Sequence, residues 1–561
     1  MDTSIGNFHL GQFEDDRYRS RLSTLLTRYN PVEIISAKRG VSADTTQAWN
    51  AACPTALHEL VSPNADCWDP SKTLRALAES DCFKIEGELD WPEGIRPLLD
   101  ESSSLGLASK EESELAIRAL GALHWYLKEC KLEQELLSRR SFEIYHPIDE
   151  EKEAGTLFGT HMVLDGMTLR NLDVLVNSST GTTHGTLLER FNRCNTAFGQ
   201  RMLRHWLCAP LCQPEAIDDR LDAVEYLTNN LSTMEEVGKI LKSLPDLERL
   251  VNKIHSQGSS LKAKNHPDSR AVFFDGHIYS KKKITDFLLT LEGFRAAQKV
   301  EEYFRDTTIV SKLLRQSVKL KEYGGEFPDM EKELEFFRKA FDHQQAAKEG
   351  TMIPRPGVDK QYDEALDRIA QVQAEAEKYL QDQKRHFNGK VSFVGADKKR
   401  FQLEVAEGAA SRADHRYELQ GQRKGFKRYY TSESRALIQQ MLAAEEQRNS
   451  ALKDISRRIF EQFDKHSILW EKTIKCLAVL DVLLALAAFG ADQKVCRPRI
   501  VSPGSNQRPF LRMVQGRHPA HSQLFANNEF IPNDVNIGSS GESQTPADHS
   551  LTLVTGTYRI V

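Results

Sequence analysis

Two long stretches without proline or glycine flank a short basic segment, and they constrain the fold of this chain most strongly. The first runs from Val358 to Asn388 and the second from Phe426 to Phe489. Both are rich in residues that favour helices. We therefore expect two long helices, the second reaching about 90 Å if it is unbroken. The segment that links them is compact, so the two helices should run antiparallel.

The linking segment, Lys384 to Tyr430, has twelve Lys and Arg against five Asp and Glu, whereas the whole chain has a net charge of −5. A positive tip on two helices suits a polyanion such as DNA. An ordinary solvated surface remains the alternative. Expected strands cover Val391–Val394, Phe401–Val405, Tyr417–Leu419 and Phe426–Tyr430. The first candidates for phosphate contact alternate with Phe426, Tyr429 and Tyr430, and a second group precedes Phe401. The first group is Arg423, Lys424, Lys427 and Arg428, and the second is Lys398, Lys399 and Arg400.

The length of 561 residues predicts three to five domains of an ordinary soluble composition. Residues 1 to about 145 read as α/β, with one long helix expected over Glu111–Ser138. Residues from about 160 to 350 read as mostly helical, with a loop at Ser256–Ser269. The apolar run Cys476–Phe489 contains Asp481 and is too short to span a bilayer, so we expect a buried core helix. The polar block Ala443–Arg448 is expected to protrude beyond the core.

Patterns that would indicate an enzyme or a metal site are missing from the sequence. There is no H-E-x-x-H or G-x-S-x-G, and Cys208 and Cys212 have no partner pair at zinc-site spacing. The apolar strand before Thr555-Gly556 resembles the start of a phosphate-binding loop, but no Gly-Lys-Ser/Thr follows. We therefore predict no catalytic residue, no metal site and no ATP hydrolysis by this chain.

The segment from Thr186 to Leu227 resembles the lever domain signature of the MutS family of DNA mismatch-repair proteins. That signature reads N-T-x-x-G-x-R-x-L-x-x-W-L-x-x-P-L and leads into an I-x-x-R-L helix. Leu244 to Arg249 matches as well. The matching positions are Asn195, Thr196, Gly199, Arg201, Leu203, Trp206, Leu207, Pro210, Leu211, Ile217, Arg220 and Leu221.

The resemblance implies a multidomain, mostly α-helical fold. It has an α/β connector, a long-helix lever with an inserted small clamp domain that contains a sheet, and a truncated start of an α/β ATPase domain. The expected ranges are 1–145 for the connector, 155–350 and 436–495 for the lever, 351–435 for the clamp, and 496–561 for the ATPase start. In this family the clamp closes around the DNA backbone.

The resemblance also implies ATP-dependent binding of mismatched double-stranded DNA in the nucleus. Residues His255–Arg270 are most similar to the branch called MutS homologue six, whose members pair with MutS homologue two. Phe530, Ile531 and Gly556 resemble nucleotide contacts of a site that uses ATP and Mg²⁺.

Departures from the family pattern suggest a fragment. No phenylalanine begins the F-x-E motif that reads mismatches, and the phosphate loop is incomplete. We expect a DNA-clamping fragment that is nearly indifferent to mismatches and has no ATPase activity. Two alternatives stay open: a helical scaffold protein that does not bind DNA, and an incomplete gene model of an active mismatch-recognition ATPase.

Overall fold

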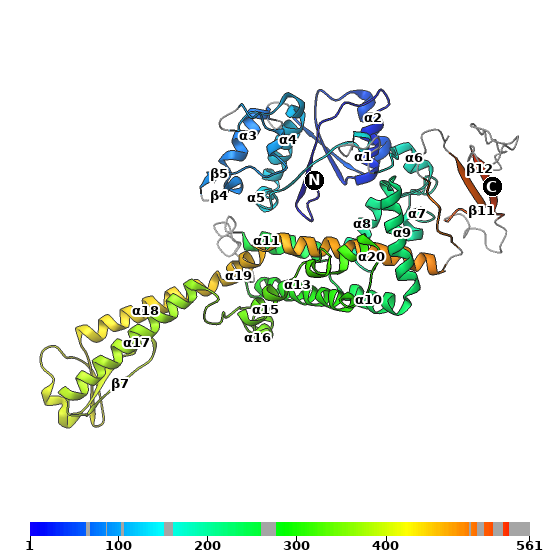
Figure 1. The fold of residues 1–561 in the computed structure, drawn as a ribbon. Helices are drawn as coiled ribbons and strands as arrows, with labels where there is room; N and C mark the ends of the chain where they lie inside the picture. Colours follow the sequence, from blue (N-terminus) through cyan, green and yellow to red (C-terminus); the bar gives the residue numbers. More distant parts are fainter. Residues whose placement is uncertain are drawn as a thin grey trace. The chain divides into compact units, whose positions relative to one another are not determined.

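The computed structural model describes residues 1–62, 68–85, 87–102, 106–150, 161–259, 276–492, 495–501, 510–519 and 531–537. These residues divide into two compact units. The first comprises 1–252, 293–329 and the chain from 468 onward, and the second comprises 253–292 and 330–467. Figure 1 shows the elements of both units.

The first unit begins with an α/β region, as the sequence predicts. Strand β1 pairs in parallel with β6, and Phe8 of β1 stacks on Phe142 of β6 with ring centroids 4.7 Å apart. Strands β2 and β3 form a second parallel pair, and β4 and β5 form a short antiparallel pair. The strands are β1 Asn7–Leu10, β2 Glu33–Ala37, β3 Leu57–Val61, β4 Lys84–Ile85, β5 Glu88–Leu89 and β6 Ser141–Ile144. The helices of this region are α1 Ser20–Tyr29, α2 Ala43–Ala52, α3 Pro70–Glu79, α4 Glu114–Glu129 and α5 Glu133–Leu137.

The expected single helix over Glu111–Ser138 is wrong, because the chain turns after Glu129. Lys131 has a left-handed φ of 59°, and the Leu132 amide donates to the Leu127 carbonyl. This pairing is typical of a helix that ends in a left-handed residue. A new helix, α5, then starts at Glu133.

The rest of the first unit is mainly helical. Its helices are α6 Gly166–Asn171, α7 Leu187–Phe191, α8 Ala197–Cys208, α9 Pro214–Asn229, α10 Leu231–Ser243, α14 Lys312–Val318, the first half of α11 Leu247–Gly258 and nearly all of α20 Ser467–Asp492. Helix α13 Gly276–Phe304 contributes its later residues. Near the end of the described chain, β11 Leu511–Gly516 pairs with β12 Asn533–Ile537 in an antiparallel hairpin.

A buried carboxylate holds the N-terminus of α8 against α20. Asp481 has no exposed surface and accepts hydrogen bonds from two residues of the sequence signature. The backbone amide of Asn195 donates to Asp481 Oδ1 at 2.9 Å, and the side-chain Nδ2 of Asn195 donates to the same oxygen at 3.2 Å. The Thr196 amide donates at 2.8 Å and its hydroxyl at 2.7 Å. The Asn-Thr of the signature therefore satisfies a charge inside the core.

Later positions of the signature tie α8 to the helices that follow. The Arg201 guanidinium donates to both carboxylate oxygens of Asp246, at 2.6 and 3.1 Å, and to Glu248 at 2.7 Å. The Arg220 guanidinium lies 3.5 Å from the ring centroid of Trp206. Burial lowers the pKa of Arg220 to about 10. The signature thus specifies how α8 and α9 pack.

Helix α20 is long and apolar enough, by length and composition, to cross a membrane, and it is the one such helix in the described residues. Its most apolar window is 67% buried within the protein. Trp470 and Leu477 have no exposed surface, and Asp481 accepts hydrogen bonds from the start of α8. The helix is thus longer than the expected apolar run Cys476–Phe489, so its length does not exclude a membrane span. Its burial is the observation that agrees with the predicted core helix.

The second unit consists of a base and an arm. The arm comprises α17 Lys360–His386, the strands β7 to β10 and α18 Ser432–Lys453. The base comprises α15 Glu331–Ala340, α16 His343–Glu349, α19 Ile455–Asp464 and the parts of α11 and α13 within this unit. Phe287 of α13 packs at the centre of the base, with ring centroids 4.9 Å from Phe460 and 5.4 Å from Phe463.

The two arm helices are antiparallel, as expected (Figure 1). Near the sheet, the Tyr379 hydroxyl of α17 lies 2.6 Å from the Thr431 hydroxyl, which caps α18. At the other end, Arg458 joins Asp359, the N-cap of α17, to the Ala451 carbonyl of α18. The expected boundary between residues 435 and 436 falls inside α18.

The structure differs from the sequence interpretation at three further places. The second stretch is not one helix: it forms β10, α18, α19 and α20, with breaks at Asp454 and after Asp464. The block Ala443–Arg448 does not simply protrude, because Ala444 is buried and Glu445 forms an ion pair with Arg400. The start of the expected loop at Ser256 is helical, because α11 continues to Gly258. Residues 260–275 lie outside the described residues.

Candidate nucleic-acid interface

The arm carries a four-stranded antiparallel sheet in the order β7-β8-β10-β9. The strands are β7 Val391–Val394, β8 Gln402–Ala406, β9 Glu418–Arg423 and β10 Phe426–Tyr430. One face packs on the end of α17. The buried cluster there contains Phe387, Val391, Leu403, Val405, Ala409 and Tyr429. The alternation of apolar residues in β8 produces this inward face.

The strand register places the two groups of predicted cations at opposite ends of the sheet. Residues Ala406, Phe426 and Arg423 lie in one row across β8, β10 and β9. The Ala406 amide donates to the Lys390 carbonyl at 3.1 Å, which adds Lys390 to this row. Strand β7 leads away from this row to the turn that contains Lys398 and Lys399. The structure therefore does not bring the seven predicted residues into one cluster.

The first end holds three exposed cations, which we call the hairpin-end cations: Lys390, Arg423 and Lys424. Lys424 and Gly425 form the turn between β9 and β10, where Gly425 has a φ of +82°. Glycine adopts this left-handed conformation without steric cost. Within the described residues these three side chains have no carboxylate partner. Glu407 brings one exposed negative charge to the same end, where its amide donates to the Gly425 carbonyl.

The other two residues of the first group point to opposite faces of the sheet. Lys427 pairs with Val405 and therefore shares the face of the apolar cluster, where it is half-buried. Arg428 pairs with Glu404 on the outer face, and its Nε donates to the Glu404 carboxylate at 2.9 Å. The charge of Arg428 is thus already balanced within the sheet.

The second end holds Lys398, Lys399 and Arg400, which we call the loop-end cations. Gly395 has a φ of +93°, and a Cβ there would lie 2.0 Å from the Lys399 carbonyl oxygen, so the turn requires glycine. Lys398 and Lys399 are exposed. Arg400 donates to both oxygens of Glu445 in α18, at 2.7 and 3.0 Å, and is therefore committed to the arm itself.

The aromatic residues of the segment do not form an exposed stacking surface. Tyr429 and Tyr430 are buried at 6% and 9% exposure, and burial raises the pKa of the Tyr429 hydroxyl. The Arg435 guanidinium lies over the Tyr430 ring at 5.5 Å. Phe426 is the aromatic residue of this group that is exposed. Of the three aromatic residues that alternate with the predicted cations, the two tyrosines are therefore not available for stacking on a nucleic acid.

Lys390 was missed at the sequence level although it lies in the same row as Arg423. It directly precedes β7, so its position follows once the strand order is known. The sequence pattern predicted four strands, but it did not indicate that β10 lies between β8 and β9.

The nucleotide-binding predictions fall mostly outside the described residues. Phe530 and Gly556 are not among them. Ile531 is described, and 78% of its surface is exposed. Within the described part of the chain, His, Cys, Asp and Glu side chains form no group of three that could hold a metal ion.

Two family profiles match this chain. MutS domain II matches residues 1–140, and MutS domain III matches residues 167–487. The first range covers the α/β region, and the second covers the helices and the arm with its sheet. The fold thus defines a multidomain, mostly helical protein with an α/β region and a helical arm that carries basic side chains. Because the domain III profile covers more than half of the sequence, the chain belongs to the MutS family.

Relatives from several eukaryotes are similar over nearly all of the chain. DNA mismatch repair protein Msh6 of Gallus gallus is 44% identical over 99% of this chain and 43% of its own length. The Homo sapiens protein of the same name is 42% identical over 99% of this chain and 42% of its own length. MSH6 of Saccharomyces cerevisiae is 28% identical over 96% of this chain and 40% of its own length. The chain therefore spans less than half the length of these relatives.

Proposed function

We propose that this chain binds duplex DNA through the hairpin end of its arm and serves in DNA mismatch repair. The observation that carries the proposal is the row formed by Lys390, Arg423 and the adjacent Lys424. These side chains are exposed and have no carboxylate partner among the described residues. The names of the relatives support the process, since each is called a DNA mismatch repair protein.

The size of the row fits a duplex. From Lys390 to Arg423 it crosses three strand intervals, or about 14 Å. A major groove is about 12 Å wide, so cations at both ends of the row can approach phosphates that border one groove. Phosphate contacts carry no sequence information. Binding through this row should therefore be equally strong for matched and mismatched duplexes.

The same proposal assigns the remaining parts by their resemblance to the family. Residues 1–145 serve as the connector, 155–350 and 436–495 as the lever, 351–435 as the clamp, and 496–561 as the start of an ATPase domain. The heterodimer partner is MutS homologue two, and the location is the nucleus. ATP and Mg²⁺ belong to the ATPase domain of the longer family protein, and we assign no ATP hydrolysis to this chain alone.

A salt titration of DNA binding tests the proposal. Fluorescence anisotropy with a labelled duplex would measure Kd for the chain and for the double variant Arg423→Gln/Lys424→Gln. Each phosphate contact contributes about 0.9 to the slope of log K against log salt. The double variant should therefore weaken binding and reduce this slope by about 1.8.

The matched control is Lys398→Gln/Lys399→Gln, which removes the same charge at the opposite end of the sheet. Its slope should stay close to that of the unmodified chain. A loss of slope in the control and not in the hairpin-end variant would move the interface to the loop end. Absence of binding, together with concentration-dependent self-association in sedimentation, would favour a helical scaffold instead.

A further inference from the structure

The arm leaves the base at a break in the helical chain. Helix α18 ends at Lys453, Asp454 has φ −101° and ψ 3°, and α19 begins at Ile455. Helix α19 is fixed in the base, because Ile459, Phe460 and Phe463 are buried there. The arm helices have a separate apolar cluster formed by Val372, Ala376, Leu437 and Met441. The break thus lies between two independently packed regions.

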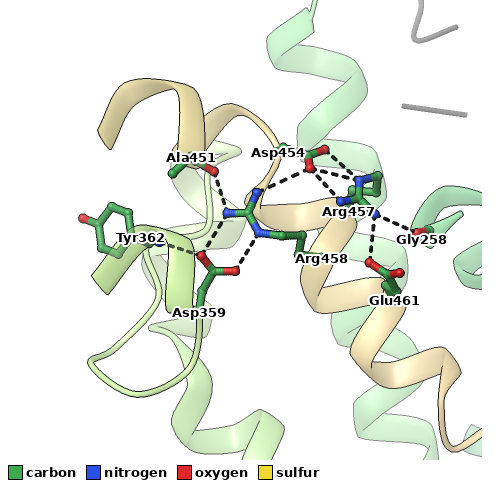
Figure 2. Close-up of polar contacts among 8 residues, drawn as sticks. All are labelled: Gly258, Asp359, Tyr362, Ala451, Asp454, Arg457, Arg458 and Glu461. Carbon is green, nitrogen blue, oxygen red and sulfur yellow. Dashed lines mark hydrogen bonds and ion pairs between the residues drawn. The ribbon is translucent and has the colours of Figure 1, made fainter. Parts of the chain in front are cut away.

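Arg458 of α19 connects the elements that meet at this break, as Figure 2 shows. Its Nε and one terminal nitrogen donate to the two oxygens of Asp359, at 2.6 and 3.0 Å. The same terminal nitrogen donates to the Ala451 carbonyl in the last turn of α18, at 2.9 Å. The other terminal nitrogen lies 3.4 Å from the Asp454 carboxylate. One guanidinium thus contacts the start of α17, the end of α18 and the residue between α18 and α19.

Asp359 has a second role as the N-cap of α17. Its Oδ1 accepts the Tyr362 amide at 2.8 Å while it also accepts Arg458. The two charged side chains are only 13% and 8% exposed. Burial would raise the pKa of Asp359, but the hydrogen bonds from Arg458 and Tyr362 outweigh it and hold the pKa below its usual value. The carboxylate therefore stays charged, and the pair with Arg458 is bidentate.

Arg457, the neighbouring residue, holds the break from the side of the base. Its guanidinium donates to both oxygens of Asp454, at 2.8 to 3.0 Å, and to Glu461 at 2.9 Å. It also lies 3.4 Å from the Gly258 carbonyl at the end of α11. A Cβ on Gly258 would come within 2.7 Å of the Glu461 amide, so α11 approaches α19 closely here.

We propose that these five charged residues, the base ion-pair cluster of Asp359, Asp454, Arg457, Arg458 and Glu461, fix the direction in which the arm leaves the base. The cluster is a positioning device and not the main source of stability, because the arm and the base each have their own buried apolar residues. The cluster can fix an orientation because Arg458 and Asp359 form a planar, bidentate pair. A flexible or monodentate contact would not hold the two helix ends at a fixed angle. This inference is independent of DNA binding by the arm.

The test removes the charge at position 359 while keeping the helix cap. Asparagine caps helices as well as aspartate does, so Asp359→Asn retains the bond to Tyr362 and weakens only the pair with Arg458. The matched control is Glu445→Gln. It weakens the similar bidentate pair with Arg400, which lies wholly within the arm.

Pulsed electron paramagnetic resonance would measure the distance between spin labels at exposed Lys332 in the base and exposed Gln420 in the arm. Labels attached through a bio-orthogonal amino acid avoid reaction with native cysteines. We expect one narrow distribution for the parent and for Glu445→Gln, and a distribution at least twice as wide for Asp359→Asn, with unchanged helix content by circular dichroism. Hydrogen exchange around residues 451–458 should become faster, on the order of a hundredfold, as a buried pair is broken.

A distribution for Asp359→Asn as narrow as that of the parent would overturn the proposal. Equal broadening by Glu445→Gln would also overturn it, because the effect would then not depend on the base. Loss of helix content together with broadening would assign the cluster to folding rather than to positioning.

Discussion

Gly199 faces Asp481 so closely that a Cβ atom at position 199 would lie 2.2 Å from the carboxylate oxygen Oδ2. It would also lie 2.8 Å from the Thr196 hydroxyl, which donates to that same oxygen. The glycine of the sequence signature therefore leaves space for the hydrogen bonds between α8 and α20. Its role is close packing, since its backbone is helical.

Gly199→Ala should destabilise the first unit, because the added methyl group displaces a buried carboxylate from its donors. Overpacking of this kind costs about 1–3 kcal/mol. Urea denaturation followed by circular dichroism would measure the loss. Gly238→Ala on α10 is the matched control, because a Cβ there meets no atom within 4 Å. The control should gain about 0.5–1 kcal/mol from helix propensity. A gain in both variants would contradict the packing role.

Asp481→Leu should cost more than Gly199→Ala, because it leaves the donors of Asn195 and Thr196 without an acceptor. Each buried unsatisfied group costs about 1–3 kcal/mol. We expect a total loss of at least about 3 kcal/mol in the same denaturation experiment. A loss below 1 kcal/mol would mean that the carboxylate is replaceable by apolar packing.

This contact also shows what the sequence could and could not predict. The spacing of Asn195, Thr196 and Gly199 indicated the family, and the apolar run around Asp481 indicated a core helix. Their contact joins residues 285 positions apart, so no local pattern could reveal it. The helix breaks at Lys131 and Asp454 were missed for a similar reason, because neither has a proline or glycine to signal it.

For the candidate interface too, local features were predictable from the sequence and long-range contacts were not. The basic segment and its four strands were predictable from charge and alternation. The ion pairs of Arg428 with Glu404 and of Arg400 with Glu445 were not predictable. Each glutamate lies on a different element from its arginine, 24 and 45 residues away in the sequence. The count of cations therefore overstated the charge that is available to a polyanion.

Glu404→Gln should strengthen DNA binding, if the arm binds DNA as proposed. The change releases the Arg428 guanidinium on the outer face of the sheet. One additional phosphate contact would steepen the slope of log K against log salt by about 0.9. Arg428→Gln should change the slope less than Arg423→Gln, since Arg428 is already paired. Salt titrations of DNA binding by the three variants would measure these slopes. Equal effects of Arg428→Gln and Arg423→Gln would contradict the interpretation that Glu404 neutralises Arg428.

His124 should make the first unit less stable in mild acid. It lies on α4 with 6% exposure, and its ring centroid is 5.4 Å from that of Trp68. Burial, aided by Lys128, lowers the pKa of His124 to about 4 from an ordinary value of 6.5. Between these values the unfolded chain takes up a proton that the folded chain does not. Stability is therefore complete above pH 6.5 and falls as the pH approaches 4.

The contribution of this histidine is at most about 3 kcal/mol over that range. Urea midpoints at pH 7.5, 6 and 5 would be compared for the parent and for His124→Leu. The variant should lose less stability than the parent on acidification, because its side chain does not titrate. Parallel pH profiles for the two proteins would show that His124 is protonated equally in both states.

The break at Asp454 makes the reach of the arm adjustable. The apolar cluster of the arm and the aromatic centre of the base are formed by different residues. Equal insertions into α17 and α18 would disturb neither if they add whole helical turns, because only then do the same faces stay in contact. Seven residues inserted into each helix, about two turns, would carry the sheet roughly 10 Å outward. Such insertions would change how far the basic hairpin extends while keeping the attachment at Asp359 and Arg458.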